Sequence, residues 1–167
     1  DSEEIAGSAS DHFDVTIHMR PDYLLDIQSD ESNQIMAYDL ENTDGEYFFQ
    51  SHSTNPLLKG ETIKAAVETF FEKIDQYDSL FSVTPLQTRL YGEHFNVLNH
   101  DPKNLIKTQE LPFVYEENSC IYVFSRNSFQ ENKNRIGSAP RLFPIDRFEA
   151  VDIDEEYDFL MAETLMQ

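Results

Sequence analysis

Basic residues are scarce in this chain of 167 residues, which has 12 Lys and Arg against 32 Asp and Glu and a formal net charge of −20. Binding to the phosphates of nucleic acid requires a basic surface, so nucleic acid is not an expected partner. Long apolar runs are also missing, because no stretch approaches the roughly 18 residues that cross a membrane. Residues 1–4 have neither the basic start nor the apolar stretch of a signal peptide. We therefore expect a soluble, cytoplasmic protein that does not bind a membrane.

Cysteine is nearly absent too. Cys120 is the single cysteine, so no internal disulfide can form, in agreement with a reducing compartment. Because Cys120 lies in an apolar run, a packed thiol is expected there rather than a nucleophile. The chain has no Gly-x-Ser-x-Gly, His-Glu-x-x-His or Cys-x-x-Cys motif, and no Walker or dinucleotide glycine loop. These absences remove the best-known signatures of hydrolases, zinc enzymes and P-loop enzymes.

Apolar residues are plentiful: they form 40% of the chain and include 13 Phe and 8 Tyr. Strand-like apolar runs alternate with amphipathic stretches, which predicts an α/β fold in a single domain, residues 1–167. The clearest helix is expected over 61–74, where apolar residues recur at the i, i+3, i+4 spacing of one buried face. Other helices are expected at 3–10, 32–41, 125–132 and 155–165, and strands at 13–18, 47–49, 79–84, 120–124, 141–143 and 148–153. Residues 86–118 are irregular and predict an extended arm.

Asp152 and Asp154 form the sharpest chemical motif. Alternate residues of an extended segment share a face, so the two carboxylates are expected to lie close together. A Mg²⁺ ion relieves their repulsion and is commonly bound by one or two carboxylates together with substrate phosphates. The alternative is structural, with Asp154 serving only as the N-cap of the last helix and Asp152 solvated. An EF-hand is rejected, because Tyr157 occupies the position that needs Gly.

A second polar cluster, residues 51–57, lies between an apolar run and the clearest helix. Its sequence is Ser-His-Ser-Thr-Asn-Pro-Leu. Loops at strand ends of open α/β sheets are common ligand sites, and hydroxyl and amide groups suit a polyhydroxy ligand. The alternative is an ordinary loop whose polar side chains bond their own backbone.

The order of these motifs resembles the acylneuraminate cytidylyltransferases, the CMP-sialic acid synthetase family. The resemblance rests on Arg-Pro at 20–21, His-Ser-Thr-Asn-Pro-Leu-Leu at 52–58, Val-Tyr-Glu-Glu-Asn-Ser at 114–119, Arg-Ile-Gly at 135–137 and Glu-Ala-Val-Asp-Ile-Asp at 149–154. It covers essentially the whole chain. It implies a Rossmann-like nucleotidyltransferase sheet, mostly parallel, with an irregular dimerisation arm at about 86–118 and a homodimer.

The resemblance also implies a reaction. Family members transfer CMP from CTP to a 2-keto sugar acid and release pyrophosphate, with Mg²⁺ as cofactor. By resemblance, Asp152 and Asp154 match the family's metal-binding aspartates. The substrate-binding positions are His52, Thr54, Asn55 and Asn118, and Arg20 matches an arginine near the nucleotide. No general base is named.

One part of the family pattern has no counterpart here. Family members begin with a strand and a loop containing Gly, Arg and Lys that holds the triphosphate, and the present resemblance starts after their second strand. We therefore expect an N-terminally truncated member of the family. Two alternatives stay open: a non-catalytic remnant that acts as a sugar-binding or dimerisation module, and an acidic α/β protein whose aspartate pair binds only a structural cation.

Overall fold

A four-stranded mixed sheet organises the molecule. The computed structural model describes residues 2–25 and 32–166. The strands are β1 (Tyr47–Gln50), β2 (Ser79–Leu86), β3 (Val114–Ser125) and β4 (Pro140–Pro144), in the order β1-β3-β2-β4. β1, β2 and β4 run in one direction, as expected for a mostly parallel sheet. Because the opposed strand β3 lies between β1 and β2, two of the three pairings are nevertheless antiparallel.

Helices cover both faces of the sheet, so the α/β expectation is confirmed. The helices are α1 (Glu3–His12), α2 (Ser32–Glu41), α3 (Gly60–Phe71), α4 (Arg126–Asn132) and α5 (Glu156–Leu165), with short 3-10 turns η1 (Asp22–Leu24) and η3 (Thr108–Glu110). Alternate residues of β3 point to opposite faces. Ile121 and Val123 pack with Phe70 of α3, whereas Tyr122 and Phe124 pack on the other face. The core on that second face is completed by Leu40 of α2 and Phe129 of α4.

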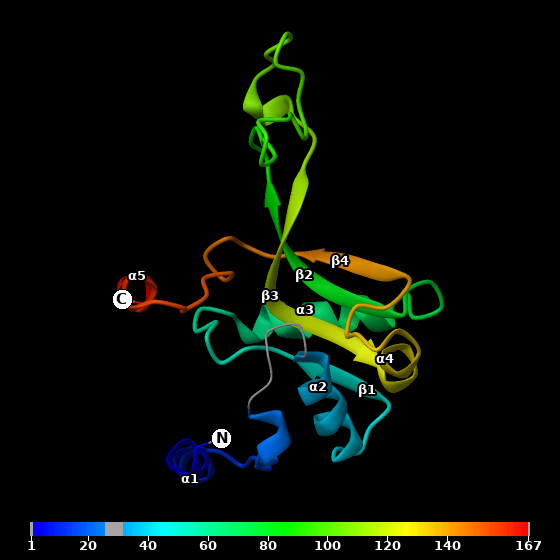
Figure 1. Cartoon of the computed structure of the whole chain (residues 1–167), viewed down its shortest axis with the longest axis vertical. Helices are drawn as coiled ribbons and strands as arrows, with labels where there is room; N and C mark the ends of the chain where they lie inside the picture. Colours follow the sequence, from blue (N-terminus) through cyan, green and yellow to red (C-terminus); the bar gives the residue numbers. More distant parts are fainter. Residues whose placement is uncertain (1, 26–31, 167) are drawn as a thin grey trace.

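A long two-stranded ribbon leaves the sheet, formed by the outer halves of β2 and β3 and the segment 87–113 (Figure 1). The pairing of β2 with β3 shifts register between Phe81 and Val83, and Ser119 has a φ of 58° at the same level of β3. A bulge of this kind bends a strand and increases its twist. The expected arm is thus present, and it begins at this bulge. Its role in dimerisation stays a prediction.

Two expected strands are wrong. Residues 13–18 alternate apolar and polar side chains, yet the structure assigns them to no strand, and Phe13 and Val15 are exposed. Residues 148–150 belong to a turn, and residues 151–153 have no regular secondary structure and lie outside the sheet. The last helix has Glu155 as its N-cap rather than Asp154, because Glu155 and Asp158 form a reciprocal capping box. Within the described parts of the chain, no helix is long and apolar enough to cross a membrane.

Candidate functional site

Two segments far apart in sequence meet beside the sheet: the loop 51–59, between β1 and α3, and the segment 145–155, between β4 and α5. The side-chain amide of Asn55 donates to the carbonyl of Val151 at 3.3 Å. The backbone N–H of Ile153 donates to the carbonyl of Thr54 at 3.0 Å. Both predicted polar motifs are therefore in direct contact, and the residues on each side of Asp152 are tied to the loop.

Asp152 and the predicted sugar residue Asn118 line one hollow of about 390 Å³. The hollow lies where the arm leaves the sheet, and it carries three carboxylates and one cation. Its remaining lining residues are Thr84, Glu116, Glu117, Ser119, Arg147, Ala150, Val151 and Met161. Such a surface combines acceptors for a cation with hydroxyl and amide groups for a polar ligand.

The carboxylate of Asp152 has an unusual environment. Its Oδ1 is buried and has no hydrogen-bond partner among the described residues. A buried carboxylate oxygen without a partner is costly unless a cation or a ligand donor meets it. Asp154, by contrast, is exposed, and its backbone N–H donates to Asp158 Oδ2 at 3.3 Å beside α5. The two aspartates therefore differ in burial although they are two residues apart.

Asn118 lines the hollow and also forms hydrogen bonds with side chains of β2. Its side-chain amide lies 2.6 Å from Ser82 Oγ and 3.0 Å from Thr84 Oγ1, both on β2. Ser82 Oγ in turn accepts the N–H of Ile121 at 2.8 Å. This network fills the bulge at the base of the arm. Asn118 therefore holds β2 and β3 together at one wall of the hollow.

Arg20 and His52 line a second hollow, of about 320 Å³. Its other lining residues are Asn33, Ile35, Met36, Asp39, Gln50 and Arg135. Burial raises the pKa of Asp39, and the neighbouring His18 and Arg20 offset part of that rise. With two guanidinium groups, this hollow suits an anionic group such as a carboxylate or a phosphate.

A chain of side chains connects the two hollows. Arg135 donates to Gln50 Oε1 at 3.0 Å, and its guanidinium lies over the ring of Tyr122. The Tyr122 hydroxyl donates to Glu117 Oε1 at 2.5 Å, and Ser119 Oγ lies 3.2 Å from the same hydroxyl oxygen. Burial and the bond to Glu117 raise the pKa of Tyr122 to about 12, so it is a hydrogen-bond donor at neutral pH. Arg135 in one hollow and Glu117 in the other are thus held by the same tyrosine.

The donor set fits a cation that is shared with a substrate. Among the described residues, no group of three or more His, Cys, Asp or Glu side chains is arranged to hold a metal ion by itself. Mg²⁺ needs only one or two protein carboxylates when phosphates complete its coordination. The buried, unpartnered Oδ1 of Asp152 is a suitable first ligand.

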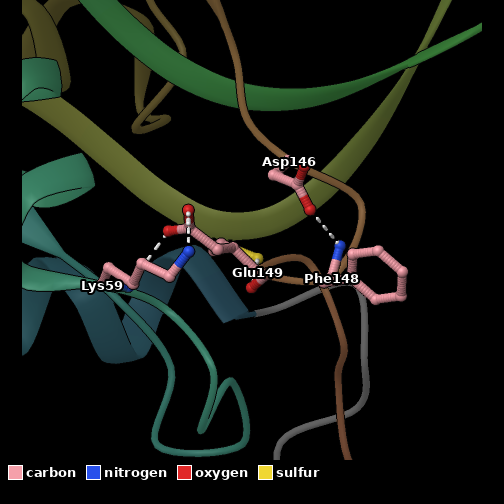
Figure 2. A network of polar contacts seen from close by, with 5 residues as sticks. Lys59, Asp146, Phe148 and Glu149 are labelled. Atoms are coloured by element: carbon pink, nitrogen blue, oxygen red, sulfur yellow. Dashed lines mark hydrogen bonds and ion pairs between the residues drawn. The ribbon is translucent and has the colours of Figure 1, made fainter. Parts of the chain in front are cut away.

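Glu149 was not identified from the sequence as a functional candidate. It is a buried carboxylate whose Oε2 accepts the backbone N–H of Lys59 at 3.1 Å, while Lys59 Nζ lies 3.5 Å from Oε1 (Figure 2). Lys59 is the N-cap of α3 and has no side-chain cap of its own. The sequence does contain one indication of this contact. The clearest helix is preceded by Lys rather than by Ser, Thr, Asp or Asn, so a group from elsewhere in the chain is needed at its N-terminus. Arg135, in the Arg-Ile-Gly motif, is likewise a residue to which the sequence alone assigns no role.

Comparison with known proteins shows the family of the chain. The family model described as Cytidylyltransferase matches residues 1–166. The post-translational flagellin modification protein B of Campylobacter coli is 30% identical over 120 residues, which are 67% of this chain and 49% of that protein. The CMP-N,N'-diacetyllegionaminic acid synthase of Campylobacter jejuni is 32% identical over 81 residues, 44% of this chain and 34% of that protein. The chain thus spans about half the length, or less, of these curated relatives.

A solved structure shares the fold. The crystal structure of 4-diphosphocytidyl-2C-methyl-D-erythritol synthase from Anaerococcus prevotii superposes with a TM-score of 0.65 at 9% identity. The match covers 99% of this chain and 77% of the other. At this identity the likeness concerns the fold alone, whereas the family model covers nearly every residue of the sequence. The chain therefore belongs to the cytidylyltransferase family.

Proposed function

We propose that the chain serves a cytidylyltransferase that transfers CMP from CTP to a sialic-acid-like 2-keto sugar acid and releases pyrophosphate. The observation that carries the proposal is the buried Oδ1 of Asp152, which has no partner among the described residues and lies in a hollow at the base of the arm. An acidic group of this kind, in a chain of this family, is suited to a cation that also binds the triphosphate.

Asp152 and Asp154 are the proposed Mg²⁺ ligands. When bound, the cation neutralises charge at the α-phosphate and lowers the pKa of the attacking sugar hydroxyl. The contribution of the chain is to hold Asp152 in place through the loop 51–59. Asn55 fits this role better than direct sugar binding, since its amide donates to the carbonyl of Val151. No side chain is proposed as a general base.

The hollow lined by Arg20, His52 and Arg135, called the cationic hollow from here on, is the proposed site for the carboxylate of the sugar acid and for the part of the nucleotide that does not share the cation at Asp152. We assign Arg20 to the nucleotide, and His52 with Arg135 to the carboxylate of the sugar acid. Planar guanidinium groups bind carboxylates and phosphates through paired hydrogen bonds. The relative named for N,N'-diacetyllegionaminic acid supports a sugar acid as the acceptor. Thr54 and Asn118 are the proposed contacts to its hydroxyl or acyl groups.

A homodimer is proposed through the arm. Its tip carries several exposed apolar side chains, namely Tyr91, Phe95, Leu98, Leu105 and Phe113. Apolar groups gathered on a protruding segment are typical of a protein–protein contact. A second copy of the chain is the proposed partner, and sedimentation of the purified protein measures the oligomeric state directly.

The proposed activity is tested by incubating the purified protein with CTP, Mg²⁺ and a panel of 2-keto sugar acids. The expected result is a CMP-sugar of matching mass and one pyrophosphate per CTP consumed, with one sugar acid. Omitting the sugar acid is the control for simple CTP hydrolysis. Sugar binding without turnover across the panel would favour a non-catalytic binding module, and neither binding nor turnover would overturn the assignment.

A further inference from the structure

Glu149 joins the start of α3 to the segment that carries Asp152. Its side chain is 8% exposed, and both carboxylate oxygens face Lys59, one the backbone N–H and the other the ammonium group. The two residues are 90 positions apart in sequence. A buried carboxylate is tolerated when it is paired and hydrogen-bonded, and a negative charge is favoured at a helix N-terminus. Glu149 therefore anchors the start of α3 by accepting the N–H of its N-cap residue, Lys59.

Two further contacts continue this junction toward Asp152. The amide of Asn55 holds the carbonyl of Val151, and the carbonyl of Thr54 holds the N–H of Ile153. With Glu149 bound to Lys59, three points of one segment are thus fixed to one loop. The contacts at Val151 and Ile153 flank Asp152 directly. The position of the Asp152 carboxylate therefore depends on the contacts between this segment and the loop 51–59.

We propose that Glu149 is a positioning residue for Asp152: its ionic bond to Lys59 at the start of α3 sets where the Asp152 carboxylate lies in the hollow. The inference rests on the proposed function, because it gives Asp152 a cation to bind. Glu149 does not compete for that cation, since its own charge is matched by Lys59. It acts through Asp152 and touches no substrate.

Asp146 provides a matched control within the same turn. Its Oδ1 accepts the N–H of Phe148 at 2.8 Å (Figure 2), and no hydrogen bond or ion pair joins its side chain to the loop 51–59 in the described structure. Asp146→Ala therefore disturbs the turn locally while leaving the junction with α3 in place. Glu149→Gln keeps an acceptor for the Lys59 N–H and removes only the charge. Glu149→Ala removes both.

The experiment measures Mn²⁺ binding by electron paramagnetic resonance, in the presence of CTP, together with hydrogen exchange at the Ile153 amide. Loss of a residue that orients a metal ligand typically weakens metal affinity by about 10- to 100-fold. We expect a loss of this size in Glu149→Ala, with faster exchange at Ile153, a smaller loss in Glu149→Gln and no measurable change in Asp146→Ala. Asp152→Asn is expected to abolish Mn²⁺ binding while Ile153 stays protected.

The two readouts separate this proposal from the proposed function. If the parent protein binds no Mn²⁺ with CTP, the metal assignment fails, and the exchange rate of Ile153 still decides whether Glu149 fixes the segment. Should Glu149→Ala fail to fold, Glu149→Gln against Asp146→Ala gives the same comparison. Folded Glu149 variants with unchanged Mn²⁺ affinity and unchanged Ile153 exchange would overturn the inference. Equal losses in Glu149→Ala and Asp146→Ala would also overturn it, since any disturbance of the turn would then suffice.

Discussion

The guanidinium carbon of Arg135 lies 3.7 Å from the centroid of the Tyr122 ring, on the face of the sheet that carries the cationic hollow. Tyr122 is fully buried, and its hydroxyl is held by Glu117 and Ser119 on the same strand. A rigid aromatic ring thus presents the guanidinium in one orientation. This is the arrangement that planar recognition of a carboxylate requires.

Replacement of Arg135 is expected to weaken binding of the sugar acid. Loss of a charged hydrogen-bond donor costs about 1.5 to 3 kcal/mol, which corresponds to roughly a 10- to 100-fold higher KM for the sugar acid in Arg135→Ala. Arg135→Lys keeps the charge but not the planar face, so only partial recovery is expected. Steady-state kinetics with the sugar acid varied give this KM.

Arg126 offers the matched control for that experiment. Its guanidinium also lies over an aromatic ring, 4.8 Å from the centroid of Phe48, and it donates to the carbonyl of Leu40 in α2 at 2.6 Å. It does not line the hollow that contains His52. Arg126→Ala is expected to lower thermal stability without changing the KM. Similar changes of KM in both variants would argue against a specific role for Arg135.

Alkaline pH is expected to destabilise the protein before general denaturation begins. Burial raises the pKa of Cys120 to about 11, with the nearby charges of Asp152 and Glu149 adding to the rise. The pKa of Tyr122 is raised to about 12. Above the ordinary pKa values of 9.0 and 10.0, the unfolded chain loses these protons while the folded chain keeps them. The contribution of the protonated Cys120 and Tyr122 to the free energy of unfolding is therefore complete below pH 9. As pH rises it is lost by about 1 kcal/mol per pH unit for each group, above pH 9 for Cys120 and above pH 10 for Tyr122.

Urea unfolding at several pH values between 8 and 11 measures this loss. Tyr122→Phe removes the tyrosine's contribution, so its curve is expected to fall less steeply above pH 10. It also loses the bonds to Glu117 and Ser119, at a cost of about 1 kcal/mol at neutral pH. A free energy of unfolding that stays constant up to pH 11 in the parent protein would contradict the prediction. It would show that burial does not keep Cys120 and Tyr122 protonated in the folded protein.

Replacement of Gly137 by Ala is expected to destabilise the protein, because there is no room for a methyl group at this position. A Cβ at this position would overlap the carboxylate of Asp78. That carboxylate is fixed, because it accepts the N–H groups of Ser138 and Ala139 at 2.7 and 3.1 Å, and the hydroxyl of Ser79 at 3.0 Å. Gly137→Ala is therefore expected to lower the free energy of unfolding by about 1 to 3 kcal/mol, the usual cost of overpacking.

A double-mutant cycle checks the cause. In an Asp78→Ala background the obstacle is gone, so the additional cost of Gly137→Ala is expected to become small. Gly60→Ala serves as the control, since no atom lies within 4 Å of its added Cβ and Ala is favoured in a helix. A Gly137→Ala variant as stable as Gly60→Ala would contradict the packing described for Asp78.

The long elements of the fold follow from periodicity alone. The helix α3 can be predicted from the sequence because apolar residues recur on one helix face over three turns. Ala66 and Phe70 on that face are buried in the structure. The β3 run from Cys120 to Phe124 is apolar at every residue because both faces of the strand are covered by helices. Such signals are strong because many residues carry the same pattern.

Contacts between segments that are far apart in the chain cannot be predicted from the sequence pattern. Residues 13–18 alternate as a strand should, but alternation indicates a face to bury and says nothing about a hydrogen-bond partner. Residues 148–153 were expected in a strand, whereas Glu149 turns instead to the start of α3. The bulge at Ser82 and Asn118 depends on side-chain networks across two strands. Each of these features is fixed by tertiary partners rather than by local sequence.

The candidate site was predicted in part. Residue types and spacing singled out Asp152 and the loop 51–57, and the structure brings the two together. By spacing alone Asp152 and Asp154 are equivalent, but of these two aspartates only Asp152 has a buried oxygen that finds no partner among the described residues. Burial, not sequence pattern, distinguishes the two carboxylates.

Asp152 is proposed to bind the cation that activates CTP, and Mg²⁺-dependent pyrophosphate release depends most directly on that binding. The rate is measured against Mg²⁺ concentration for the parent protein, Asp152→Asn and Asp154→Asn, with circular dichroism to verify folding. We expect Asp152→Asn to lose at least about 100-fold in rate, as for removal of a group that stabilises developing charge, and Asp154→Asn to lose less. A folded Asp152→Asn protein that keeps the parent rate and Mg²⁺ dependence would contradict the account.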